Sequence, residues 1–143
     1  MKDCIFCKIG RHEARSWMVA ESEHACAIFD INPMGKWHTM VMPKRHYENI
    51  FDIPLEALNE VMAVLKYVTD LYHKKLGIDA VQIISNNGKA AQQSVFHAHW
   101  HIAPRHPNDG QNLLWKFYPE LVDEFHDMLK ELGVGKFTDA PIR

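Results

Sequence analysis

Residues 94–105 alternate between histidines and apolar residues, and this pattern constrains the fold more than any other stretch. In order, they are Ser94, Val95, Phe96, His97, Ala98, His99, Trp100, His101, Ile102, Ala103, Pro104 and Arg105. Alternation predicts a β-strand, because successive side chains of a strand point to opposite faces of its sheet. We therefore expect His97, His99 and His101 on one face. The opposite face, expected to pack on the core, carries Phe96, Ala98, Trp100 and Ile102.

Length and composition limit the class of protein. A chain of 143 residues predicts a single domain over 1–143. A net charge of −2 provides no broad basic field, which argues against nonspecific nucleic-acid binding. Three cysteines and no long apolar run argue against a secreted disulfide framework and against a membrane span. We therefore expect a cytoplasmic protein.

The other elements predicted from the sequence are short strands and two helices. Strands are expected at 17–21, 25–30, 38–42 and 80–85, between polar turns. A long helix is expected over 54–76, because apolar residues recur at three- and four-residue spacing between Pro54 and Gly77. A second helix is expected over 120–132. Because a polar turn joins strand 80–85 to the histidine strand, we expect these two to pair antiparallel.

Two cysteines near the start, Cys4 and Cys7, leave three interpretations open. They are half of a zinc site, a redox pair, or two small residues that pack by chance. The redox pair is disfavoured, because the βαβ context that it requires is absent. His46 and His97 are plausible further ligands, and a closed site with four protein ligands would make the zinc structural. The third cysteine, Cys26, is expected to be a small buried residue.

The histidine row also permits chemistry on phosphorus. At strand rise, the Cα atoms of His97 and His101 lie ~13 Å apart, so one metal ion held by all three imidazoles is strained. We expect one end of the row to bind metal and the other to react, although a catalytic metal on the row is an alternative. A neutral imidazole is a competent nucleophile, and Gln93, Ser94 and the backbone of loop 88–93 offer donors to a phosphate.

Residues 97–103 follow the order His-apolar-His-apolar-His-apolar-apolar, and other segments add to the pattern. These segments are 4–9, 29–33, 38–46, 85–88 and 93–96. Together they resemble the histidine triad (HIT) family of hydrolases and nucleotide-binding proteins, in its zinc-containing bacterial type. The resemblance covers roughly residues 3–105, and the segment 106–143 is variable.

The resemblance implies a fold, an assembly and an activity. The fold is α+β, with a five-stranded antiparallel sheet, a long helix and a C-terminal helix, and two subunits usually pair as a homodimer. The activity is hydrolysis at the α-phosphate of nucleoside phosphoramidates or dinucleoside polyphosphates, through a nucleotidyl-histidine on His99, and adenosine is the expected nucleoside. An alternative is a regulatory module that binds a purine nucleotide with incidental turnover.

The resemblance also implies roles for individual residues. His101 would hydrogen-bond the phosphate, Ser94 would assist the leaving group, Gln93 would hold phosphate oxygens, and His38 would support the row. Residues expected around the nucleoside are Asp30 at the ribose hydroxyls, Asn86 at the ribose or phosphate, and Phe6, Ile9, Ile28 and Ile31 at the base. The implied ligands of a structural zinc ion are Cys4, Cys7, His46 and His97.

One loop of this chain departs from the family pattern, and one histidine distinguishes between two branches of the family. The family often has glycines just before the Gln-Ser pair, where this chain has Ala90, Ala91 and Gln92. Alanine adopts positive φ less freely than glycine, so we expect a differently shaped loop. The third histidine is His101 and not the glutamine of the uridylyltransferase branch, which favours a hydrolase.

Overall fold

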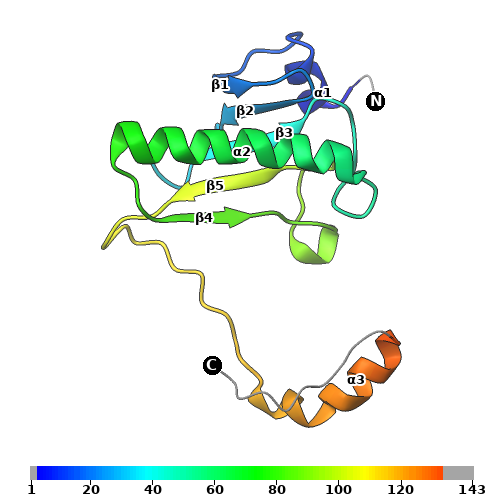
Figure 1. Ribbon diagram of the computed structural model, residues 1–143. Helices are drawn as coiled ribbons and strands as arrows, with labels where there is room; N and C mark the ends of the chain where they lie inside the picture. Colours follow the sequence, from blue (N-terminus) through cyan, green and yellow to red (C-terminus); the bar gives the residue numbers. More distant parts are fainter. Residues whose placement is uncertain (1–2, 134–143) are drawn as a thin grey trace. The chain divides into compact units, whose positions relative to one another are not determined.

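The computed structural model describes residues 3–133 (Figure 1). The chain divides into two compact units, Met1–Gln111 and Asn112–Arg143, which are taken separately below. The single domain that we expected over 1–143 stays a prediction. Among the described residues, no helix is both long enough and apolar enough to cross a membrane.

The first unit is built on a five-stranded antiparallel sheet, as the sequence predicted (Figure 1). Its strands are β1 (Met18–Glu21), β2 (Ala25–Phe29), β3 (Thr39–Pro43), β4 (Val81–Ile84) and β5 (Trp100–Pro104). They lie in the order β1-β2-β3-β5-β4, which places the histidine-bearing β5 inside the sheet. The expected antiparallel pairing of β4 with β5 is confirmed.

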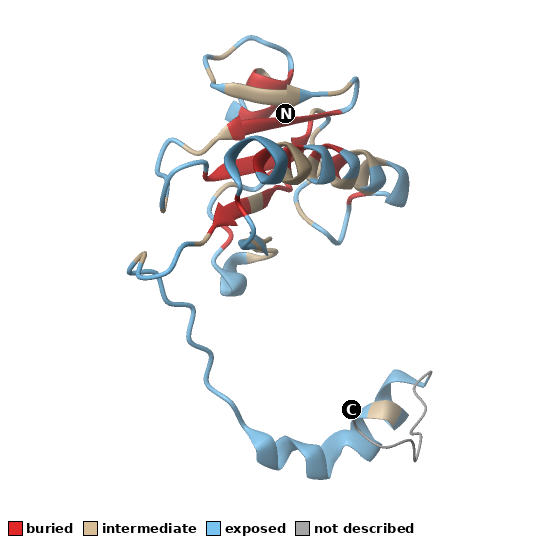
Figure 2. Cartoon of the chain, turned by 60° about the vertical axis from the view of Figure 1, so that its left-hand side comes forward, coloured by how far each residue is buried: buried red, intermediate tan, exposed pale blue. Residues whose placement is uncertain are grey.

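The helix α2 (Leu55–Leu76) runs across one face of the sheet (Figure 1). Its inward residues are buried, as are the sheet residues beneath it (Figure 2). Each such apolar side chain contributes roughly 1.5–3 kcal/mol on full burial. Gly77 ends the helix in the left-handed region, with φ of 66°, as expected, whereas Pro54 precedes the first helical residue. The core members on this side include Ala25, Ala27, Val41, Val61, Val64, Val68, Trp100 and Ile102.

The other face of the sheet is covered by a short helix that the sequence analysis missed, α1 (Ile5–Gly10). Phe6 and Ile9 of α1 pack against Cys26 and Ile28 of β2, together with methionines of β3. Because Ala25 and Ala27 belong to the α2 side, β2 alternates between two apolar layers. The α1 side of the sheet carries the cavity and side-chain clusters described below.

The prediction that the whole histidine row forms a strand is wrong in part. Strand β5 begins only at Trp100, and His97 and His99 precede it. The pairing with β3 stops at Val41 opposite Trp100, and the following Pro43 has no N–H to donate to a ladder. Contacts with a loop hold this segment instead, such as the hydrogen bond from the N–H of Ala98 to the carbonyl of Tyr47 at 2.7 Å. Phe96, which we expected in the core, is 42% exposed.

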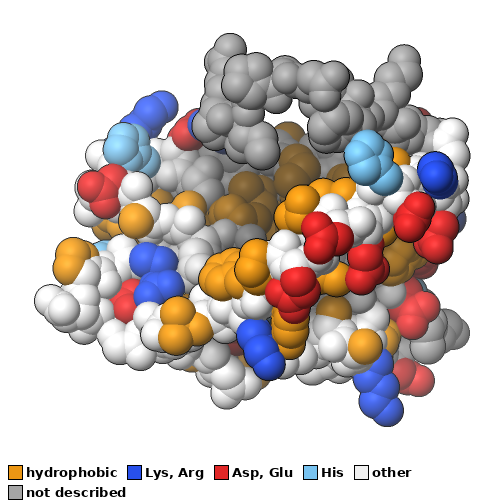
Figure 3. Space-filling model, turned by 90° about the horizontal axis from the view of Figure 1, so that it is seen from below, with side chains coloured by type: hydrophobic (Ala, Val, Ile, Leu, Met, Phe, Trp, Pro, Cys, Tyr) orange, Lys and Arg blue, Asp and Glu red, His pale blue; other side chains and the backbone are white. Residues whose placement is uncertain are grey.

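The sequence predicted one helix over 120–132, which lies in the second unit. The structure has two elements there: a 3-10 helix, Pro119–Glu124, and the α-helix α3, Phe125–Leu132. Leu121, Phe125 and Leu132 are exposed. Seen from below, the surface of the molecule displays hydrophobic side chains beside acidic ones (Figure 3).

Candidate functional site

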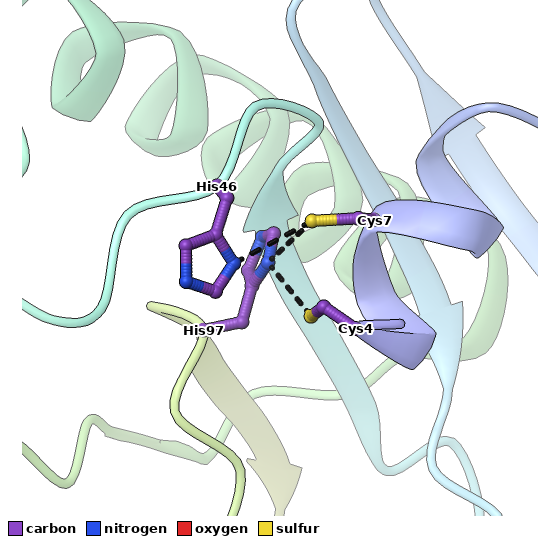
Figure 4. Close-up of side chains that lie close together, drawn as sticks. All are labelled: Cys4, Cys7, His46 and His97. Carbon is purple, nitrogen blue, oxygen red and sulfur yellow. Dashed lines mark hydrogen bonds between the residues drawn. The ribbon is translucent and has the colours of Figure 1, made fainter. Parts of the chain in front are cut away.

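Two cysteines and two histidines from distant parts of the sequence meet beside α1 (Figure 4). Cys4 and Cys7 lie at the start of the chain, His46 follows β3, and His97 precedes β5. The Sγ atom of Cys4 lies 3.5 Å from Nδ1 of His97, and Sγ of Cys7 lies 3.5 Å from Nδ1 of His46 and 3.6 Å from Nδ1 of His97. The four donor atoms lie within 4.8 Å of one another. These are the four residues that the family resemblance implied as ligands of a zinc ion.

The donors in this cluster suit a tetrahedral zinc ion. Zinc bond lengths of about 2.3 Å to sulfur and 2.0–2.1 Å to nitrogen place S and N about 3.6 Å apart in a tetrahedron. His97 donates its Nε2–H to the carbonyl of Pro43 at 2.7 Å, so the lone pair on its Nδ1 points to the sulfurs. Burial raises the pKa of Cys7, and a bound cation would offset this by favouring the thiolate.

Beside the cluster lies a cavity of about 450 Å³. Every residue that we expected around a nucleotide lines it: Phe6, Ile9, Ile28, Asp30, Ile31, Asn86, Gln93, Ser94, His99 and His101. The cavity also has lining residues that the sequence analysis missed, among them Arg15, Trp17 and Gln92. Arg15 and Trp17 belong to no motif, and they reach the cavity because they lead into β1.

The tautomer of His99 is fixed by the backbone. Its Nδ1 lies 2.7 Å from the carbonyl oxygen of His97, which can only accept, so Nδ1 carries the hydrogen. The lone pair is therefore on Nε2. The ring of Phe6 meets the His99 ring edge-on, with centroids 5.3 Å apart. The ring of His101 also meets the His99 ring edge-on, with centroids 5.0 Å apart. His99 is thus an oriented imidazole with a basic nitrogen beside the cavity.

A chain of hydrogen bonds fixes His101 in the same way. The backbone N–H of Met34 donates to Nδ1 of His38 at 3.0 Å, so Nε2 of His38 carries the hydrogen. This Nε2 lies 2.8 Å from Nδ1 of His101, which accepts, so the Nε2 of His101 is a donor. His38 does not line the cavity itself and acts from behind His101, where the sequence analysis expected a supporting residue.

Burial keeps these two imidazoles neutral. It lowers the pKa of His101 to about 4, with further lowering by His99 and His38. Burial also lowers the pKa of His38, against an opposing effect of the nearby Asp30 carboxylate. Neutral rings at pH 7 are consistent with the tautomers that the hydrogen bonds require.

Gln93 is tied into its own loop. Its Oε1 accepts from the backbone N–H of Gly88 at 2.8 Å, and its Nε2 donates to the carbonyls of Glu48 and Val95 at 2.7 and 3.1 Å. The phosphate contact that we expected of Gln93 stays a prediction. The loop turns at Gln92 with φ of 67°, a left-handed conformation without a glycine.

The three imidazoles of the row do not converge on one point. Within residues 3–133, two groups of side chains have donor atoms close enough to hold a metal ion, the Cys-His cluster and the set of Asp30, His38 and His101, although His38 and His101 hydrogen-bond to each other. His97 belongs to the first and His101 to the second, and His99 belongs to neither. The arrangement gives no support to a catalytic metal on the whole row.

The antiparallel sheet and the row of His97, His99 and His101 beside a cavity point to the histidine triad class of proteins. The HIT domain family model matches residues 11–108, and the chain belongs to this family. An uncharacterised HIT-like protein of Methanocaldococcus jannaschii is 44% identical over 130 residues, which is 90% of this chain and 98% of that protein.

Two further similarities bear on chemistry. The adenosine 5'-monophosphoramidase of Saccharomyces cerevisiae is 34% identical over 130 residues, covering 90% of this chain and 80% of that protein. The crystal structure of a zinc-bound histidine triad family protein from Mycobacterium smegmatis matches with a TM-score of 0.71 and 32% identity. That match covers 92% of this chain and 96% of the solved chain.

Proposed function

We propose that this protein is a nucleotide hydrolase that cleaves at the α-phosphate of nucleoside phosphoramidates or dinucleoside polyphosphates. The observation that carries the proposal is the hydrogen bond from His99 Nδ1 to the carbonyl of His97 at 2.7 Å. This bond leaves the Nε2 lone pair free as a nucleophile beside a cavity of suitable size. The similarity to a yeast adenosine 5'-monophosphoramidase supports the substrate class.

The proposed reaction has two steps through a nucleotidyl-histidine. His99 Nε2 attacks the α-phosphorus, and the bond from phosphorus to the leaving group breaks, its electron pair departing with that group. The leaving nitrogen or oxygen takes a proton through the hydroxyl of Ser94, which is replenished from solvent. Water then attacks the same phosphorus, the bond to His99 breaks, and a nucleoside monophosphate leaves. The Nε2–H of His101 offers a hydrogen bond to the charge on the phosphoryl oxygens.

The proposed binding mode uses the two ends of the cavity. Asp30 follows β2, and its carboxylate suits the ribose hydroxyls, with Asn86 at the ribose or phosphate. Gln93 lies beside Ser94 at the phosphate end. Its side-chain N–H groups already donate to two backbone carbonyls, so we propose that it braces the loop beside the phosphate. The base meets the apolar walls. These are Phe6, Ile9, Ile28 and Ile31.

We propose that the Cys-His cluster holds a structural zinc ion. The ligands would be Cys4, Cys7, His46 and His97, and the closeness of their donor atoms, all within 4.8 Å of one another, supports this proposal. Bound there, zinc would tie the start of the chain to the segment that precedes His99. The zinc-bound relative from Mycobacterium smegmatis supports this choice of metal.

We also propose a homodimer in the cytoplasm. The edge strand β4 exposes Val81 and Ile83, and an exposed apolar edge is a surface on which a second copy can pair. Cys4 and Cys7 must stay reduced to bind metal, which a reducing compartment favours. Light scattering of the purified protein tests the dimer, and fractionation of cells tests the compartment.

The test of the reaction is to replace His99 with alanine. We expect His99→Ala to lose at least about a thousandfold in kcat on adenosine 5'-phosphoramidate, since the nucleophile is gone. Rapid quenching followed by intact-mass measurement should detect a nucleotidyl adduct in the wild type and none in the variant. His24→Ala, which changes an exposed histidine outside the cavity, is the matched control.

The outcomes separate the leading proposal from its alternative. If His99→Ala turned over the substrate as fast as the wild type, the covalent mechanism would be wrong. Tight binding of AMP by calorimetry, with negligible turnover across a panel of leaving groups, would favour the regulatory nucleotide-binding module instead.

A further inference from the structure

Arg15 and Trp17 form a cationic aromatic rim on the cavity. Both line it, and both lie in the segment that leads into β1. The guanidinium carbon of Arg15 lies 5.5 Å from the centre of the Trp17 ring. In the described part of the chain, Arg15 has no carboxylate partner, in contrast to Arg11, which pairs with Glu13 at 2.8 Å. Arg15 thus presents unpaired N–H donors at the rim.

The order of the strands places this rim at the end of the cavity opposite the histidines. The carbonyl of Trp17 accepts a hydrogen bond from the backbone of Phe29 at 3.0 Å, which anchors it at the β1 edge. His101 lies on β5, three strand spacings away, or about 14 Å. Asp30 follows β2, which lies between β1 and β5 in the strand order, and its carboxylate reaches to 3.7 Å from Nδ1 of His101. A nucleotide whose phosphate meets the histidines and whose ribose meets Asp30 therefore extends its base toward the rim.

We propose that the rim contacts the base and selects guanine over adenine, in contrast to the adenosine expected from the sequence. This inference rests on the proposed nucleotide function. Guanine presents two adjacent acceptors, O6 and N7, whereas adenine presents the N7 acceptor beside the N6 amino donor. The guanidinium of Arg15 offers paired donors, which match guanine and meet the adenine amino group with a second donor.

Trp17 strengthens this selection by holding Arg15 in place. A guanidinium held over an indole loses less freedom when it binds, since the cation–π contact already restricts its position. Trp17 is 53% exposed, so part of its ring remains free for contact with a purine. The rim therefore acts on the affinity for the base and not on the chemistry at the phosphorus.

The experiment compares guanosine and adenosine 5'-phosphoramidates, which differ only in the base. For the wild type we expect a higher kcat/KM with guanosine. In Arg15→Ala we expect the ratio of the two kcat/KM values to fall about tenfold, through a rise in KM for guanosine. Arg15→Lys keeps the charge and loses the paired donors, so it should recover only part of the ratio. Arg11→Ala is the matched control, and it should leave the ratio as in the wild type.

Calorimetry with GMP and AMP separates failure of this inference from failure of the proposed function. Tighter binding of GMP than AMP, lost in Arg15→Ala, supports base selection even if no hydrolysis occurs. Hydrolysis with equal affinity for the two bases overturns the inference and leaves the hydrolase intact. An unchanged base ratio in Arg15→Ala also overturns it, and so does the absence of binding of either nucleotide.

Discussion

The Nε2 of His38 lies 2.8 Å from the Nδ1 of His101, and this contact joins the residue before β3 to a residue of β5, 63 positions further along the chain. Because Met34 donates to the other nitrogen of His38, the direction of the hydrogen bond is fixed from backbone to His38 to His101. His101 is thereby held with its Nε2 as a donor. His38 therefore lies where the family resemblance implies a histidine that supports the row.

Replacing His38 should therefore affect turnover through His101. We expect His38→Ala to lower kcat about 10- to 100-fold, since one buried hydrogen bond is lost and the tautomer of His101 is freed. His38→Gln, whose amide N–H can donate to His101, should recover part of the loss. Steady-state kinetics across pH checks this prediction. A purely structural role would give equal losses in both variants and an unshifted pH profile.

The buried state of His101 predicts a dependence of stability on pH. Its pKa is lowered to about 4 from the ordinary 6.5, so the unfolded chain binds the proton more tightly than the folded one. Stability is therefore fully present above about pH 6.5 and is lost as the pH falls toward 4. The loss should be on the order of 1–3 kcal/mol.

Denaturant unfolding at pH 7.5, 6 and 5 measures this effect. His101→Asn should flatten the decline relative to the wild type, whereas the exposed His24→Asn should not. If the free energy of unfolding fell equally in the wild type and in His101→Asn, groups other than His101 would cause the effect. The proposed metal ligands are such groups, because their protonation in acid releases metal.

Removal of the proposed zinc should destabilise the fold. At a thousandfold excess of free metal over Kd, binding contributes about 4 kcal/mol, which chelation would withdraw. We expect Cys7→Ser to show a similar loss and to purify without zinc by elemental analysis. Cys26→Ala, which changes a buried cysteine outside the cluster, should retain one zinc per chain. A full complement of zinc in Cys7→Ser would contradict the assigned ligand set.

Truncation of Gln93 should loosen its loop. Gln93→Ala removes the partners of the Gly88 N–H and of two carbonyls, and we expect it to cost about 2 kcal/mol. Gln111→Ala loses a single exposed hydrogen bond to Met34 and should cost less than about 0.5 kcal/mol. Thermal unfolding compares the two. Equal small losses would mean that the Gln93 amide is not a structural brace.

Local patterns were enough to predict most of the secondary structure. Helix α2 and its end at Gly77 follow from three- and four-residue apolar spacing and a residue that tolerates positive φ. Alternation predicted β5 but extended it too far, because periodicity carries no information on where a neighbouring strand stops. The first part of the 120–132 segment belongs to the 3-10 helix Pro119–Glu124, a form that is frequent at the ends of α-helices.

The sequence by itself determined the chemistry available to this protein: a row of imidazoles, two cysteines near its start and the residue types that suit a nucleotide. Only the tertiary structure decided which nitrogen of each ring is basic, since carbonyls of His97 and Pro43 and the N–H of Met34 fix the tautomers. It also decided that Arg15 and Trp17 reach the cavity, because strand order, and not sequence spacing, places the start of β1 at the cavity.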